Sequence, residues 1–172
     1  MRLRAQVFRA HDPRWAFEPS SGAGAALHGG RFNRPGRAAL YTSLSPQGAW
    51  TEAQQGFPFK AQPVTTCTYE VDCEDVEDLS DPATLVRFGV SASDLACAWE
   101  DLASRGKTPP SWEISDRLLA RKVAGLIVPS FAPGATLDMR NLVFWTWGDS
   151  LPHQVRVVDD LGRLPRDQSS WR

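Results

Sequence analysis

Short segments in which apolar and polar residues alternate recur along the chain, and this pattern predicts strands that bury one face. The clearest is 64–71, which is dense in β-branched residues. In the segment 37–43, Tyr41 and Ser43 fall on the same face of the expected strand. Further strands are expected at 6–10, 126–128, 141–147 and 154–158.

Capping signals predict where helices begin. The pair Ser45-Pro46 places an N-cap serine before a proline at the first helical position, which predicts a helix over 46–55. Ser91 and Asp94 have the spacing of a capping box, so a helix is expected behind them, and a third is expected over 112–122. Because strands and helices follow one another irregularly, the pattern favours an α+β fold over a doubly wound sheet.

In other segments the apolar residues show no regular spacing. The stretch 17–30 is rich in Pro, Ser, Gly and Ala and is expected to be a long ordered loop, a kind of loop that is often functional. The acidic run 72–78 is expected to be a solvated turn, 131–140 a loop and 161–172 a polar tail.

Composition narrows the class of protein. A chain of 172 residues predicts a single domain over 1–172. The formal net charge of -1 gives no general attraction to polyanions, which disfavours nucleic-acid binding. No apolar run is long enough to span a membrane, and the first residues lack the pattern of a signal peptide. With three cysteines and no C-x-x-C pair, reduced thiols in a cytoplasmic protein are expected.

Two common kinds of catalytic site find no support in the sequence. The three histidines are scattered, no H-E-x-x-H motif occurs and the cysteines lack ligand spacing, so no metal site is expected. Ser130 follows Val128-Pro129 rather than standing in G-x-S-x-G, so a serine hydrolase is disfavoured. From its position alone, Ser130 fits a strand-end hydroxyl that caps a turn.

The stretch 29–52 holds the best candidate site. A glycine turn ends in Arg31, a short strand carries Tyr41, and a helix carries Glu52. Taken singly, they fit a surface arginine, a core tyrosine and an exposed helix glutamate. Taken together, a cation, an aromatic hydroxyl and a carboxylate come from three consecutive pieces of backbone, and we expect them to converge on a dinucleotide.

The same residues carry a resemblance to a known family, the RES domain. The likeness rests on Gly29-Gly30-Arg31-Phe32-Asn33, Leu40-Tyr41-Thr42, Ala49 with Glu52, and Val128-Pro129-Ser130 followed by Asn141-Leu142. The family is named after arginine, glutamate and serine positions, which match Arg31, Glu52 and Ser130. Phe32 stands where the family normally has tryptophan, a departure that keeps an aromatic ring.

The resemblance implies an ADP-ribosyltransferase-like fold, with two small packed β-sheets and helices around a cleft for NAD. It implies a toxin of a type II toxin–antitoxin pair, covered by an Xre-like antitoxin. The phrases 8–13 and 151–153 look like the ParT-type branch, which transfers ADP-ribose to itself and to a protein target, phosphoribosyl pyrophosphate synthetase. Other members of the family destroy NAD by hydrolysis or phosphorolysis.

Roles for individual residues follow from this resemblance. Because nicotinamide leaves as a neutral group, no general acid is needed, and Glu52 alone would stabilise positive charge at the anomeric carbon. Arg31 would grip the pyrophosphate with its fork of donors, and Gly30 would let backbone approach the phosphates. Tyr41 would stack on nicotinamide or bond to it through its hydroxyl. The polar wall of the NAD site would be completed by Ser130 and Asn141.

The acceptor stays open at this stage. Water would make the protein an NAD glycohydrolase, phosphate an NAD phosphorylase, and a protein side chain a transferase. Arginine-directed transferases carry a second glutamate two residues before the catalytic one, where this chain has Trp50, so an arginine acceptor is disfavoured. A different class of function also remains, namely a catalytically inactive module whose cleft receives a partner's tail.

Overall fold

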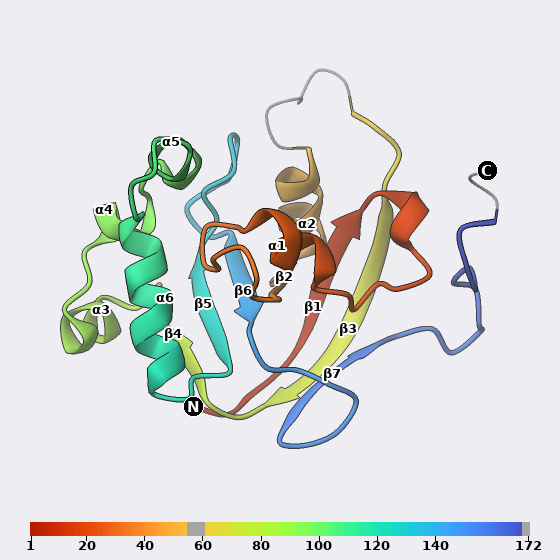
Figure 1. The fold of residues 1–172 in the computed structure, drawn as a ribbon. Coiled ribbons are helices and arrows are strands. Elements are labelled where there is room, and N and C mark those ends of the chain that lie inside the picture. Colours follow the sequence, from red (N-terminus) through yellow and green to blue (C-terminus); the bar gives the residue numbers. More distant parts are fainter. Residues whose placement is uncertain (55–60, 170–172) are drawn as a thin grey trace.

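One mixed β-sheet runs through the computed structural model, which describes residues 1–54 and 61–169 (Figure 1). Within that part of the chain, the seven strands lie in the order β4-β5-β6-β2-β1-β3-β7. Their bounds are β1 Leu3–His11, β2 Leu40–Ser43, β3 Thr65–Cys73, β4 Val76–Asp78, β5 Gly125–Pro129, β6 Arg140–Phe144 and β7 His153–Val157. β4 and β5 pair in parallel, and the other neighbours are antiparallel.

Short helices surround this sheet (Figure 1). They are η1 Pro13–Trp15, α1 Ala23–His28, α2 Pro46–Ala53, α3 Pro82–Phe88, α4 Ala92–Leu95, α5 Trp99–Ser104 and α6 Pro110–Ala120. α3 to α6 gather at the end of the sheet where β4 and β5 lie, while α2 packs against β1. Residues of α2 and of α5 both line the candidate site, and residues of α1 line it as well.

The alternation along β5 and β6 supplies a core on each face of the sheet. Val128 and Val143 pack with Leu118 of α6 in one buried cluster. Leu142, on the opposite face of β6, packs with Val7 of β1 in the other. The first cluster is closed by the helices α4 and α6, and the second by partly buried side chains that include Trp147 and Leu164.

Each strand and each cap expected from the sequence is present, with boundaries shifted by a few residues. Ser45 caps α2 by accepting a hydrogen bond from the Gly48 amide at 3.0 Å. Ser91 and Asp94 form the expected capping box. The predicted helix over 46–55 was expected to end at Gln55, which lies outside the described residues.

Several sequence expectations were wrong. The segment 17–30 contains α1, which the lack of an apolar period concealed. The acidic run 72–78 includes β4, because Val76 turns inward and its strand pairs with β5. The helix behind Ser91 is divided into α4 and α5. The strand 141–147 ends at Phe144, beyond which the Trp145 and Thr146 amides donate to the Ala124 carbonyl.

The expectation of two small packed sheets was also wrong, and the pairing of β1 explains why. β1 pairs with β2 at one position only, Phe8 with Ser43. On its other side β1 pairs with β3 from Leu3 to His11. The two halves, β4-β5-β6-β2 and β1-β3-β7, are thus joined into one sheet by a single pair of residues. We call the region beyond this pair, where β1 and β2 separate, the seam.

Candidate active site

A pocket of about 780 Å³ opens over β2 and β6, within the size range of pockets that hold small-molecule ligands. α1 lines one side with Gly24 and His28, and α5 lines another with Trp99 and Glu100. Phe131, from the segment after β5, closes a third side. The candidate residues Arg31, Tyr41 and Glu52 from the stretch 29–52 all line this pocket, as does Gly30.

Arg31 stands at the tip of a tight turn formed by residues 30–33, which we call the arginine turn. Backbone bonds join Gly30 and Asn33 in both directions, at 3.0 and 3.3 Å. The Asn33 side chain, 1% exposed, donates to the Ala25 and Arg37 carbonyls, and thereby fixes the turn to its flanking segments. The indole N–H of Trp112 donates to the Gly30 carbonyl, and that of Trp145 donates to the Phe32 carbonyl, both at 2.8 Å. We call the side chains that hold the arginine turn in this way the clamp.

Tyr41 belongs to the same clamp. Its hydroxyl accepts from the Phe32 amide at 3.0 Å and donates to Asn33 Oδ1 at 2.7 Å. Burial raises the pKa of Tyr41 above its ordinary value, so the hydroxyl keeps its proton. A hydrogen bond donated by this hydroxyl to a ligand would compete with its bond to Asn33, whereas the ring lines the pocket and is placed to stack.

Gly30 is required by the same contacts. A Cβ at Gly30 would lie 2.5 Å from the Tyr41 hydroxyl and 2.7 Å from Asn33 Oδ1. The absence of a side chain therefore makes room for the clamp as well as exposing backbone to the pocket. From the sequence, only the approach of backbone to a ligand was expected at Gly30.

The Arg31 guanidinium is half-buried and anchored on one edge. Its Nη1 donates to the carbonyls of Leu95 at 3.2 Å and Cys97 at 2.5 Å. Its carbon lies 4.7 Å from the centre of the Phe131 ring, a cation–π distance. Burial lowers the pKa of Arg31 from its ordinary value, opposed by groups that include Glu52 and Glu100. A cation kept in this setting favours an anionic ligand.

α2 carries Glu52 into the pocket from the opposite side. Gly48 brings the helix close to β2, because a Cβ there would collide with the Ser43 hydroxyl. Gly48, Ala49 and Thr51 are buried beneath the helix, so its orientation about its own axis is set. Glu52 follows in sequence and faces the pocket.

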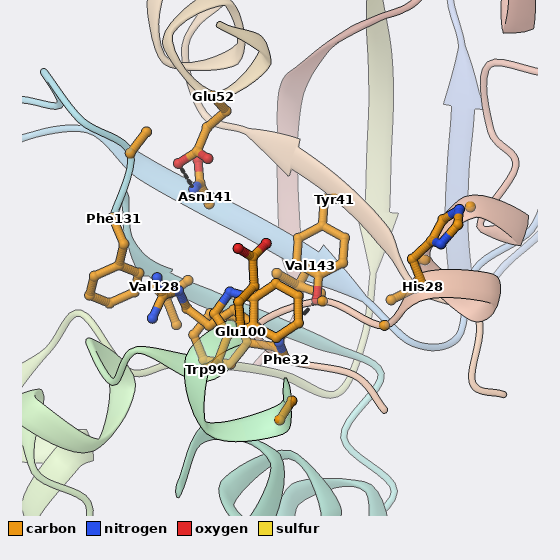
Figure 2. A pocket seen from close by; sticks show the side chains of 18 of the residues that line it. His28, Phe32, Tyr41, Glu52, Trp99, Glu100, Val128, Phe131, Asn141 and Val143 are labelled. Atoms are coloured by element: carbon orange, nitrogen blue, oxygen red, sulfur yellow. Dashed lines mark hydrogen bonds between the residues drawn. The ribbon is translucent and has the colours of Figure 1, made fainter. Parts of the chain in front are cut away.

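Glu52, Ser130 and Asn141 form a hydrogen-bonded group that we call the glutamate cluster. Glu52 Oε1 accepts from Ser130 Oγ and from Asn141 Nδ2, each at 2.5 Å. The bond to Asn141 is drawn in Figure 2. The pairing of Val128 with Asn141 across β5 and β6 places the serine and the asparagine beside each other. Ser130 thus touches the carboxylate and is absent from the pocket lining, which suits a residue that orients Glu52.

The pocket carries groups that could bind the separate parts of a dinucleotide. Asn141 Oδ1 is a buried acceptor with no hydrogen-bond partner in the described residues, so a ligand donor such as an amide or hydroxyl would satisfy it. The pocket places the Arg31 cation and the Tyr41 and Phe131 rings within one volume. A pyrophosphate, a flat heterocycle and a ribose would each find a matching group there.

A smaller hollow of about 210 Å³ adjoins the pocket at the seam. Phe8 and Ala10 of β1, Thr42 of β2 and Ala53 of α2 line it. Glu52 and Asn141 border both spaces, so the glutamate cluster stands between them. The hollow exists because β1 and β2 do not pair beyond Phe8 and Ser43.

Sequence reasoning missed part of the site. Asn33 was noticed only as part of the resemblance, although a buried asparagine beside a glycine turn is a recognisable clamp. Phe131 directly follows Ser130, and its aromatic type was the available signal. Trp99 and Glu100 lie on α5, far from the stretch 29–52 in sequence, and no local pattern connects them to it.

The described residues contain neither a cluster of metal ligands nor a helix that could span a membrane. No group of three or more His, Cys, Asp or Glu side chains there is placed to hold a metal ion. None of the helices in that part of the chain has the length and apolar character needed to cross a membrane.

Comparison with known proteins adds two findings. The family model described as the RES domain matches residues 6–167. A chain in the crystal structure of the M. tuberculosis MbcT-MbcA toxin–antitoxin complex has a similar fold, with a TM-score of 0.57 and 20% identity over 92% of this chain and 84% of that one. A search of curated proteins gives no match.

Proposed function

This chain belongs to the RES domain family, since the family model spans residues 6–167, and on that premise we propose that it is a toxin that acts on NAD. It cleaves the bond between nicotinamide and ribose and transfers ADP-ribose to a protein. The observation that carries this proposal is the glutamate cluster facing Arg31 across one pocket. Hydrolysis or phosphorolysis of NAD would use the same cluster and differ only in the acceptor.

Each residue has a defined part in this reaction. Glu52 stabilises the positive charge that grows at the anomeric carbon as nicotinamide departs. Ser130 and Asn141 hold the carboxylate in place, so it need not reorganise during the reaction. Arg31 pairs with the pyrophosphate, and the Tyr41 ring stacks on the nicotinamide.

The arrangement of the sheet supports an evolutionary relation to ADP-ribosyltransferases. The resemblance implied two small sheets around an NAD cleft, and the two halves of this sheet are joined only at Phe8 and Ser43. The glutamate cluster lies where these halves separate. We infer that the seam is the NAD cleft of an ADP-ribosyltransferase-like fold.

A partner is part of the proposal. The structurally similar chain comes from a complex described as toxin and antitoxin. We infer that an Xre-like antitoxin covers the pocket of this chain and presents a carboxylate to Arg31, whose charge would attract it. An antitoxin that binds away from the pocket and leaves NAD turnover unchanged would contradict this.

One incubation tests the function. The purified chain is mixed with NAD labelled in the adenylate part, with and without a cell lysate, and with phosphoribosyl pyrophosphate synthetase as a purified candidate target. Nicotinamide release with label on a protein supports transfer. Nicotinamide release with only free ADP-ribose or its phosphate supports degradation. Absence of nicotinamide release in every mixture would leave the inactive binding module as the better account.

A further inference from the structure

A second carboxylate, Glu100, enters the same pocket as Glu52. It lies in the first turn of α5, its side chain is exposed, and it lines the pocket beside Trp99. Glu100 belongs to none of the motif positions that mark the family resemblance. Its presence follows from the fold, because α5 and α2, which are distant in the sequence, both line this pocket.

The two carboxylates approach the pocket from different walls. Glu52 descends from α2, whereas Glu100 points up from α5 into the pocket, toward the side where Glu52 and Asn141 lie (Figure 2). Both act electrostatically on Arg31 and oppose the lowering of its pKa by burial. Arg31 is therefore within the electrostatic reach of both, and a substrate held by Arg31 would meet both.

The surroundings of the two groups differ in a way that suits separate roles. Glu52 is half-buried and held by Ser130 and Asn141. Within residues 1–54 and 61–169, no hydrogen bond or ion pair holds the carboxylate of Glu100. Its neighbour Asp101 instead pairs with Arg105 at 2.8 Å. A carboxylate fixed by hydrogen bonds suits the stabilisation of charge. A carboxylate whose oxygens are not engaged by the protein can accept a proton from a hydroxyl within hydrogen-bond reach.

We propose that Glu100 is the general base that accepts a proton from the attacking acceptor, an inference that rests on the proposed function above. The acceptor is a hydroxyl, either of water or of a protein side chain. The hydroxyl oxygen forms a bond to the anomeric carbon while the bond from that carbon to the nicotinamide nitrogen breaks. The electron pair of the broken bond leaves with neutral nicotinamide, and the hydroxyl proton passes to Glu100. The step involves no change in oxidation state.

This role also separates the possible acceptors. A neutral hydroxyl gains nucleophilicity from a base, and two residues before Glu52 the chain has Trp50 instead of a carboxylate that could serve as one. Phosphate carries its own negative charge, needs no base, and would be repelled by Glu100. The pocket therefore favours a hydroxyl acceptor over phosphate.

The test compares Glu100→Gln with wild type, and with Asp101→Asn as a matched control that removes the adjacent charge outside the pocket lining. Nicotinamide release, free ADP-ribose and protein-bound ADP-ribose are measured over a range of NAD concentrations. Glu100→Gln should lower kcat about 10²-fold for both kinds of product while the KM for NAD stays unchanged. Asp101→Asn should match wild type.

Sodium azide supplies the decisive arm, because azide attacks carbon without losing a proton. Azide should restore nicotinamide release by Glu100→Gln, with formation of ADP-ribosyl azide, and should have little effect on wild type. A loss of kcat that azide does not restore, a changed KM with kcat intact, or wild-type kinetics in Glu100→Gln would each overturn the role of Glu100. Turnover by wild type and Asp101→Asn in the same assay tests the proposed function separately, and its absence in both would overturn the two proposals together.

Discussion

The two sides of β1 differ sharply in how they are paired. Toward β3, every residue from Leu3 to His11 has a partner, and β3 continues this ladder into β7. Toward β2, only Phe8 and Ser43 are paired, and a hollow lined by Glu52 takes the place of the ladder. On the paired side, the backbone groups of β1, β3 and β7 are hydrogen-bonded to one another and form a rigid scaffold. The seam leaves space and polar groups for a ligand, which is why the candidate chemistry gathers there.

The comparison leads to a general expectation. Changes on the paired side should alter the free energy of unfolding and leave the chemistry of each folded molecule intact. Changes at the seam and around the pocket should alter the chemistry with smaller effects on folding. The variants below test this division, starting with the largest expected effect.

The largest effect is expected from Tyr69→Ala on the paired side. Tyr69 is fully buried in β3, and its hydroxyl donates to the Pro19 carbonyl at 2.6 Å. Removing a buried aromatic ring typically costs about 3–5 kcal/mol of unfolding free energy, which urea denaturation would measure. NAD turnover per folded molecule should stay at the wild-type level. The milder Tyr69→Phe, which keeps the ring, serves if the alanine variant does not fold, and reduced turnover per folded molecule in either would break the division.

Gly30→Ala should affect both quantities, because the arginine turn belongs to the core and to the pocket. The new Cβ would press on the Tyr41 hydroxyl and Asn33 Oδ1, and overpacking of this kind costs about 1–3 kcal/mol. Displacement of the turn should also move Arg31 and reduce NAD turnover. Gly148→Ala is the control, since a Cβ there meets nothing within 4 Å. Equal melting temperatures and turnover in both variants would show that the clamp is dispensable.

Arg31→Lys should sharpen the comparison on the pocket side. Lysine keeps the charge but loses the planar fork and the anchoring of Nη1 to the Leu95 and Cys97 carbonyls. We expect the KM for NAD to rise about tenfold, equivalent to about 1.4 kcal/mol, with a smaller change in kcat. Arg34→Lys, at a residue outside the pocket lining that pairs with Asp116 on the surface, should leave both constants unchanged. Wild-type kinetics for Arg31→Lys would remove Arg31 from the site.

A further prediction concerns the pH dependence of stability and involves His11, at the end of the paired side. Burial, followed by the charge of Arg9, lowers the pKa of His11 from 6.5 to about 4, while Asp12 opposes this. Between these two pKa values the unfolded chain binds the proton and the folded chain does not. Stability should therefore decrease as the pH falls from 6.5 to about 4, and change little through His11 outside that window.

Denaturation curves at several pH values check this prediction, with His11→Leu as the comparison because leucine does not titrate. The variant should show a flatter dependence of unfolding free energy on pH within the window. The carboxyl groups of Asp72 and Asp81, whose pKa values are lowered by hydrogen bonds, titrate below it. Parallel curves for wild type and His11→Leu would contradict the assignment.

Local signals in the sequence located most of the helices and strands, and the candidate residues that they carry line one pocket. Ser45-Pro46 predicted the start of α2, and α2 carries Glu52 into the pocket. The register between strands could not be predicted from the sequence. The approach of Ser130 to Asn141 depends on that register, because it follows from the pairing of β5 with β6. The same holds for the single sheet, which depends on one pair of residues between β1 and β2 that no local pattern reveals.

Residues brought in from distant segments were the hardest to predict. The tryptophans of the clamp contact the arginine turn, and Glu100 lines the pocket, only because the chain folds. In the sequence nothing distinguishes them from any other core tryptophan or helix glutamate. The roles of Arg31, Tyr41, Glu52, Ser130 and Asn141 toward NAD remain predictions, which the geometry makes specific enough to test.

The central claim is that Glu52 is the carboxylate that promotes cleavage of NAD, and one variant tests it most directly. Glu52→Gln keeps the shape of the side chain and removes its charge. NAD turnover and thermal melting of the purified variant are measured beside wild type and beside Glu113→Gln, an exposed glutamate on α6 outside the pocket lining. We predict a loss of turnover of about 10²–10³-fold in Glu52→Gln alone, with all three proteins melting at similar temperatures. Turnover within a few-fold of wild type, with an unchanged melting temperature, would contradict the account.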